Sequence, residues 1–149
     1  MLILCCGNPD RGDDGAGAIV AQRLKRRAIT AEICTGEASH LLEKWQGISD
    51  VIVVDAVITG GRPGTIHEWN ASETNLPPQQ SVSTHGLGVA AAVEIARTLG
   101  KLPRRLRVYG IEAEQFEPLT GISPIVRQAA EELAVRIAAE CRAASACEP

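Results

Sequence analysis

The eight residues DVIVVDAV, at positions 50–57, form a nearly continuous run of branched apolar side chains. A strand with one face in water alternates apolar and polar residues, whereas a strand buried on both faces has a run like this one. Strands of that kind belong to parallel sheets that helices cover on both sides. The run therefore predicts the central strand of an α/β sheet, and Asp55 interrupts it near its end.

Predicted strands and helices alternate on both sides of this run. We expect strands near 2–6, 30–35, 65–69 and 105–111, and helices near 15–26, 38–46 and 86–99, followed by a last helix that Ser123 caps and Pro124 opens. Such alternation predicts a three-layer α/β fold. Its mostly parallel, twisted sheet of about five strands has helices on both faces and one antiparallel strand near 65–69.

Length and composition limit the class of protein. The length of 149 residues predicts a single domain over 1–149. Hydrophobic residues make up 45% of the chain and aromatic residues only 3%, so we expect an aliphatic core. A net charge of −3 argues against a nucleic-acid partner, which would require a basic excess. We expect a monomer.

The compartment follows from what the sequence lacks. No apolar stretch is long enough to cross a membrane, and the start MLILCCGN has no signal-peptide pattern. We therefore expect a cytoplasmic protein with no membrane partner. The five cysteines then fit reduced thiols, with Cys5 and Cys6 packed as small apolar residues of the first strand.

Polar residues able to do chemistry follow the predicted strands at their carboxyl ends, where open α/β sheets bind ligands. Asp13 and Asp14 follow the first strand, Asp55 ends the third, His85 precedes a helix and Glu112 follows the last strand. Asp14, Asp55 and His85 together offer two oxygen donors and one nitrogen, a set that suits a divalent transition metal. A simpler role than metal binding exists for each of these residues except Asp55. Either Asp13 or Asp14 could cap a helix, but a carboxylate in a buried strand is costly unless it is paired or ligated.

The glycine-rich loop after the first strand raises the alternative of nucleotide binding. Its glycines do not follow the GxGxxG spacing, no Gly-Lys-Ser/Thr follows, and its carboxylates would repel phosphate. Nucleotide binding is therefore the weaker hypothesis. We interpret His40 and His67 as surface or structural residues, with His67 on a sheet face away from the acids.

Four motifs in order give the chain a family resemblance. CGNPDRGDDGAG, VIVVDAV, STHGLGV and GIEAEQFEPLTGISP resemble the successive motifs of hydrogenase maturation endopeptidases, and they span nearly the whole chain. The resemblance implies an endopeptidase that removes the C-terminal extension of a nickel-iron hydrogenase large-subunit precursor after its metal centre is inserted. It also implies that Asp14, Asp55 and His85 recognise nickel supplied by the substrate, or another divalent metal in its place, and that Asp14 and Asp55 are catalytic.

Two positions depart from the family pattern, and two questions stay open. Many members have Glu where this chain has Asp14, and an acid where it has Cys34. The mechanism is either metal-dependent or of the aspartic type, and we expect only weak metal binding before substrate arrives. The alternative function is a chaperone that binds the metal-bearing precursor without cutting it.

Overall fold

The computed structural model describes residues 1–77 and 88–146. Within these ranges the strands are β1 (Leu2–Cys6), β2 (Glu32–Cys34), β3 (Asp50–Val57), β4 (Ile66–Asn70) and β5 (Arg105–Glu112). The helices are the short 3-10 helix η1 (Gly12–Gly15) and the α-helices α1 (Ala16–Lys25), α2 (Ala38–Trp45), α3 (Val89–Leu99) and α4 (Pro124–Ala146). The predicted element types are thus confirmed, and the largest shift at a boundary is the start of α3 at Val89.

The five strands form one sheet in the order β2-β1-β3-β5-β4. β1, β2, β3 and β5 are parallel, and β4 alone runs antiparallel, along the outer side of β5. The predicted α/β fold with one antiparallel strand is therefore confirmed. The run at 50–57 lies at the centre of the sheet, where it pairs with a parallel neighbour on each side.

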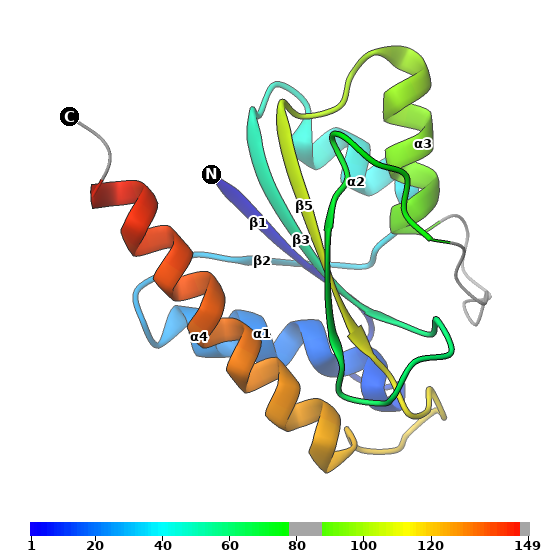
Figure 1. The fold of residues 1–149 in the computed structure, drawn as a ribbon. Coiled ribbons are helices and arrows are strands. Elements are labelled where there is room, and N and C mark those ends of the chain that lie inside the picture. The colour runs from blue at the N-terminus through cyan, green and yellow to red at the C-terminus, as the bar shows by residue number, and fades with distance from the viewer. Residues whose placement is uncertain (78–87, 147–149) are drawn as a thin grey trace.

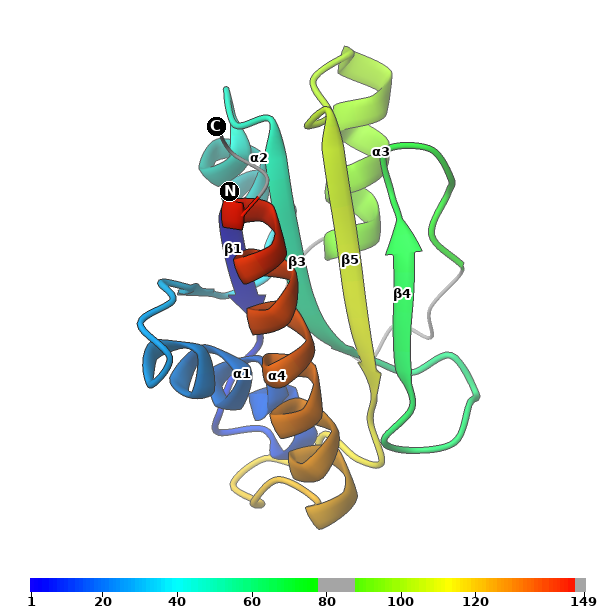
Figure 2. The same cartoon turned by 60° about the vertical axis from the view of Figure 1, so that its left-hand side comes forward.

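The sheet is the middle of three layers. α1 and α4 lie against one face, and α2 and α3 lie against the other (Figures 1 and 2). Successive residues of β3 alternate between the two layers, as the pleat of a strand requires: Ile52 and Val54 pack with α1 and α4, and Val51 and Val53 pack with α2 and α3. Both faces of β3 are thus buried, which explains why its sequence does not alternate.

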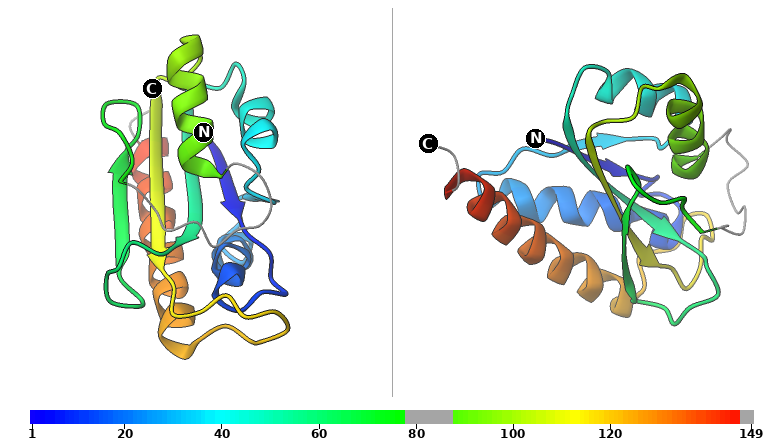
Figure 3. Two further views of the ribbon diagram at one scale, coloured as in Figure 1. Left: turned by 90° about the vertical axis from the view of Figure 1, so that its right-hand side faces the viewer. Right: turned by 45° about the horizontal axis from the view of Figure 1, so that its top comes forward.

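The parallel strands all point towards the same edge of the sheet, which we call the carboxyl edge. β1 ends there at Cys6, β2 at Cys34, β3 at Val57 and β5 at Glu112. Because α3 leads directly into β5, it runs back along the sheet, and its N-terminal end lies towards this edge (Figure 3). Every acid that the sequence pointed to belongs to this edge or to the loops that extend from it.

Glycine shapes the first loop at the carboxyl edge. Gly7 has φ +129°, a backbone conformation that side chains rarely adopt, and a Cβ there would lie 2.0 Å from the carbonyl oxygen of Asp14. A Cβ on Gly17 would lie 2.4 Å from the carbonyl oxygen of Cys6. The loop therefore folds back tightly over the end of β1, and this keeps Asp14 close to the sheet.

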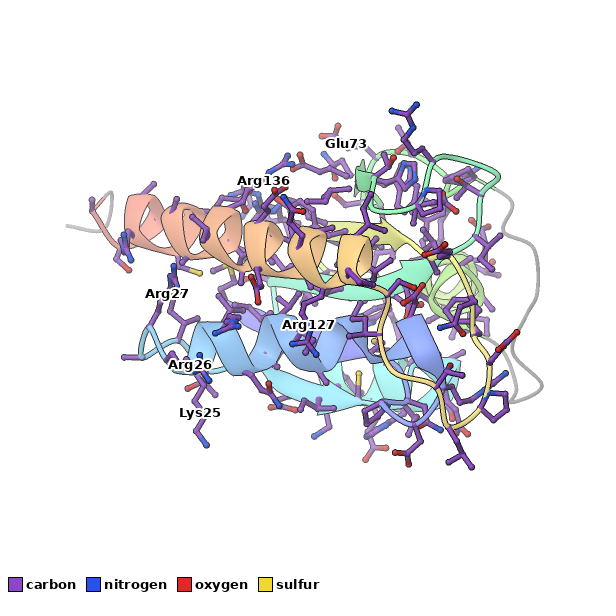
Figure 4. All side chains as sticks on the ribbon, turned by 90° about the horizontal axis from the view of Figure 1, so that it is seen from below. Lys25, Arg26, Arg27, Glu73, Arg127 and Arg136 are labelled. Carbon is purple, nitrogen blue, oxygen red and sulfur yellow. The ribbon has the colours of Figure 1, made fainter. Side chains whose placement is uncertain are left out.

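A polar network fixes α4 to the sheet face that it covers together with α1. The hydroxyl of Tyr109 donates to Glu140 and lies 3.2 Å from Glu68, and the guanidinium of Arg136 lies over the Tyr109 ring and pairs with Glu68. Figure 4 shows α4 beside α1, with Lys25, Arg26 and Arg27 at the C-terminal end of α1, where positive charge interacts favourably with the helix dipole.

Among the described residues no helix is long and apolar enough to cross a membrane.

Candidate functional site

Asp14 and Asp55 come together at the carboxyl edge from two different elements. Asp14 belongs to η1, the short helix between β1 and α1, and Asp55 is the sixth residue of β3. The two carboxyl groups are near enough that the negative charge of Asp14 acts on the ionisation of Asp55. The sequence placed both acids at one edge, and the structure brings them within electrostatic reach of each other.

Asp55 is the more strongly perturbed of the two acids. Burial and then the charge of Asp14 raise the pKa of its carboxyl from 3.8 to about 8. Within the described part of the chain, the carboxyl accepts one hydrogen bond, from the backbone N–H of Ala56 at 3.0 Å. A half-buried carboxyl with so few partners gains a great deal from a cation, which would replace its proton.

Asp14 is held by its own loop. The backbone N–H of Asn8 donates to its Oδ2 at 2.9 Å. Burial raises the pKa of Asp14, and the Asn8 hydrogen bond and the charge of Arg11 oppose that shift without cancelling it. Asp14 does not cap a helix with its side chain, so the simpler role that the sequence allowed for it is wrong.

Asp13, the neighbour of Asp14, has a different task. Its fully buried carboxylate accepts hydrogen bonds from the backbone N–H groups of Glu114, Gln115 and Ser123, at 2.7, 3.1 and 2.7 Å, and from the Ser123 hydroxyl at 2.9 Å. Asp13 therefore ties the first loop to the loop between β5 and α4. Asp13 does not cap α1 with its side chain, so the simpler role that the sequence allowed for it is also wrong. Ser123 lies at the start of α4 as expected, since its carbonyl accepts from the N–H of Arg127.

A second polar group lies on the same sheet face, on β4 and β5. His67 of β4 and Asp55 of β3 both pair with Gly110 of β5, so the three residues form a row across the sheet. His67 stacks on Trp69, which packs in the α2–α3 layer. His67 therefore shares the face of Asp55, and the prediction that it lies on the other face is wrong. Alternation along a strand shows which residues share a face, but it does not show which layer that face meets.

His67 is nevertheless engaged with other residues. Its Nε2 lies 3.0 Å from Oε1 of the buried Glu112, which also accepts from the N–H of Thr59 at 2.8 Å and from the Thr59 hydroxyl. Burial acts to raise the pKa of Glu112, but these hydrogen bonds and the charge of His67 outweigh it and lower that pKa. His67 lies two strand spacings, about 10 Å, from Asp55. This group therefore fixes the turn before β4 and does not complete the carboxylate pair.

Two cysteines lie at the site that were predicted only to pack or to replace an acid. Cys6 and Cys34 end β1 and β2 in register, and their Sγ atoms are 3.1 Å apart on the α2–α3 face. Both thiols are coupled electrostatically to Asp55: the charge of Asp55 raises the pKa of Cys6, and Cys34 adds to the rise in the pKa of Asp55. The signal in the sequence was their position, since each cysteine is the last residue of a parallel strand.

The third predicted ligand, His85, lies outside the described residues. Among the residues that are described, no group of three or more His, Cys, Asp or Glu side chains is arranged to hold a metal ion. The part of the candidate site that is described is therefore a pair of carboxyl groups with unequal pKa values. Carboxylate oxygens are suitable donors to a divalent cation that brings further ligands of its own.

The glycine loop is poorly suited to bind a phosphate. The N–H groups of Arg11, Gly12, Asp13 and Asp14 all donate to backbone carbonyls, and the N–H of Asn8 donates to Asp14. Phosphate loops require free N–H groups directed at the ligand. This geometry disfavours the nucleotide-binding alternative.

Comparison with known proteins decides the family. The profile of the hydrogenase maturation protease family matches residues 20–140, most of the chain. The chain belongs to the hydrogenase maturation protease family. The Hydrogenase 2 maturation protease of Escherichia coli (strain K12) is 27% identical over 95% of this chain and 90% of its own length.

Solved structures of this family share the fold. The hydrogenase maturating endopeptidase HybD from E. coli has a TM-score of 0.74 at 24% identity, over 96% of this chain and 92% of that one. The hydrogenase maturation protease HycI from Thermococcus kodakarensis KOD1 has a TM-score of 0.63 at 27% identity, over 92% and 88%. As a family member the chain is an endopeptidase, and the non-cleaving chaperone becomes the weaker alternative.

Proposed function

We propose that this protease removes the C-terminal extension of a nickel-iron hydrogenase large-subunit precursor once the metal centre is in place. Asp14, Asp55 and His85 recognise the nickel that the precursor carries, and Asp14 and Asp55 take part in the cleavage. Membership of the hydrogenase maturation protease family supports the class of substrate.

The observation that carries this proposal is the unequal pair of carboxyl groups. Near neutral pH the free site holds a proton on Asp55, whose pKa is about 8, beside Asp14. A divalent cation brought by the substrate replaces that proton and relieves the repulsion between the two acids. The site thus gains most from a substrate that arrives with its metal.

The weak resting site follows from the same geometry. Two carboxyl groups and a single histidine leave a coordination shell incomplete, and the precursor supplies the remaining ligands. His85 stands four positions before Val89, and α3 begins towards the carboxyl edge, which supports including His85.

The chemistry requires a water molecule and a proton acceptor at the scissile peptide bond. The metal of the substrate supplies charge that can polarise a carbonyl oxygen or a water molecule. An ionised carboxylate, Asp14 or Asp55, accepts the proton of the attacking water and returns it to the leaving amine. In both routes the two acids must stand next to the bond that breaks.

The test compares two forms of one purified precursor, with and without inserted nickel. Each is incubated with the protease, and mass spectrometry measures the large subunit. We expect shortening at a single position in the nickel-loaded form and none in the nickel-free form. Equal cleavage of both forms would disprove recognition through nickel, and stable binding without shortening of either form would favour the chaperone.

A further inference from the structure

The thiols of Cys6 and Cys34 form a pair that the proposed chemistry does not use. They end adjacent parallel strands at directly paired positions, and their Sγ atoms are 3.1 Å apart. A disulfide requires Cα atoms about 4.4 to 6.8 Å apart and an S–S bond of about 2.0 Å. Adjacent strands are about 4.8 Å apart, so the bond can form with only a small shift of β1 and β2.

We propose that Cys6 and Cys34 are a peroxide-sensitive dithiol that closes into a disulfide and thereby switches off the neighbouring carboxylate site. The effect on cleavage rests on the proposed function, whereas disulfide formation does not depend on it.

The two thiols are unequal, and this assigns their roles. The hydrogen bond from the Cys6 thiol lowers the pKa of Cys34, so Cys34 is the one that ionises. The same hydrogen bond, together with burial, raises the pKa of Cys6. Because the thiolate is the nucleophile, Cys34 reacts first and Cys6 resolves the product.

Access limits the oxidant to a small molecule. Cys34 is only 5% exposed and Cys6 is 1% exposed, but Thr35 and Glu37, which follow Cys34, are exposed. The oxidant must therefore be small, and hydrogen peroxide is much smaller than a disulfide reagent.

The chemical steps balance with one peroxide. The Cys34 thiolate attacks one peroxide oxygen, the O–O bond breaks, and Cys34 becomes a sulfenic acid while hydroxide leaves. The sulfur of Cys6 then attacks the sulfur of Cys34, the S–O bond breaks, and a second hydroxide leaves. The two hydroxides take up the two thiol protons as water, so two thiols are oxidised by two electrons and peroxide is reduced to two waters.

The position of the pair connects it to the acids. The carbonyl of Cys34 accepts from the N–H of Gly7 at 3.1 Å, and Gly7 packs directly against the backbone of Asp14. Drawing the sulfurs together by about 1 Å therefore moves the root of the loop that carries Asp14. Misplacing a catalytic group by about 1 Å can cost about 100-fold in rate, so we expect the part of this shift that reaches Asp14 to slow cleavage at least tenfold.

β1 supplies a matched control for the test. Cys5 and Cys6 are adjacent and both buried, but Cys5 packs in the α1–α4 layer and Cys6 in the α2–α3 layer. The test uses the full chain with Cys141→Ser and Cys147→Ser as background, so that only three thiols remain. Cys5→Ala, Cys6→Ala and Cys34→Ala are compared in it, and circular dichroism confirms that each variant folds.

Peptide mapping after peroxide treatment gives the first readout. We expect the background protein to lose the mass of two hydrogen atoms and to yield tryptic peptide 1–11 linked to peptide 28–44. Cys5→Ala should form this link at the same rate, and Cys6→Ala and Cys34→Ala should not form it. A folded protein without the link, or a link that disappears in Cys5→Ala and persists in Cys6→Ala, would overturn the proposal.

Cleavage of the nickel-loaded precursor gives the second readout. We expect the oxidised protein to cleave at least tenfold more slowly than the reduced protein and to recover when a dithiol reductant is added. The double variant with Cys6→Ala and Cys34→Ala should cleave at the same rate before and after peroxide treatment. A linked protein that cleaves at the rate of the reduced form would overturn the switch. A reduced protein that never cleaves would instead contradict the proposed function, while the mapping result would still stand.

Discussion

Asp13 and Asp14 are adjacent and chemically identical, yet the fold gives them opposite roles. Asp13 is fully buried and accepts four hydrogen bonds that join two loops. Asp14 accepts one bond from Asn8, and burial makes its charge unfavourable. The first carboxylate stabilises the structure, and the second is available for chemistry.

This contrast predicts different results for the same substitution. In Asp13→Asn an amide group must face at least one backbone N–H donor, so we expect a loss of about 2 to 4 kcal/mol of unfolding free energy in urea. Asp14→Asn should be as stable as the parent or slightly more stable, and it should lose cleavage. Equal stability of Asp13→Asn and the parent would contradict the role assigned to Asp13.

The raised pKa of Asp55 predicts how stability depends on pH. The folded chain keeps a proton on Asp55 up to about pH 8, whereas the unfolded chain releases it near the ordinary value of 3.8. Between these pH values the folded state binds more protons than the unfolded state, so the free energy of unfolding falls as pH rises. Asp55 contributes at most about 1.4 kcal/mol per pH unit to this fall, and nothing further above about pH 8.

Denaturation of the parent and of Asp55→Asn from pH 4 to pH 9 measures this effect. The stability of Asp55→Asn relative to the parent should increase with pH and then level off. A difference that stays constant across this range would mean that Asp55 titrates normally in the folded chain.

At the scale of elements, the contact between α1 and β1 determines where the first loop lies. Gly17 lies in the first turn of α1, and a Cβ there would be 2.4 Å from the carbonyl oxygen of Cys6. Helix propensity alone predicts that Gly17→Ala stabilises the protein by about 1 kcal/mol. The close contact predicts the opposite sign, because backbone atoms must move, and we expect a loss of about 1 to 3 kcal/mol.

Chemical denaturation of Gly17→Ala therefore distinguishes the two effects by the sign of the change in unfolding free energy. A variant that is more stable than the parent would show that α1 does not pack this closely on β1. Ala18→Gly, at the next position of the helix, serves as the control and should cost about 1 kcal/mol from propensity alone.

At the scale of the whole molecule, much of the fold could be predicted from the sequence. The buried run at 50–57 and the alternation around it predicted the three layers and the antiparallel strand, because hydrophobic period and strand order along the chain are local signals. The same signals placed Asp14 and Asp55 at one edge. Their proximity follows from β1 lying next to β3 in the sheet.

The remaining features depend on contacts between distant residues. Asp13 reaches residues about a hundred positions away, and no local pattern predicts this. The face of His67 depends on which layer covers β4, and the Cys6–Cys34 pair depends on β2 lying beside β1 in register. A single sequence shows the period of each strand but neither its neighbours nor its register.

Our proposed function requires Asp55 and His85 to act together on a metal-bearing precursor. The most direct test is the rate at which nickel-loaded precursor is shortened by the parent, Asp55→Asn, His85→Ala and the control His40→Ala, with circular dichroism to confirm folding. We predict that Asp55→Asn and His85→Ala are each slower by about 100-fold or more, while His40→Ala stays within about twofold of the parent. Normal rates for folded Asp55→Asn and His85→Ala would show that these two residues do not form the cleavage site.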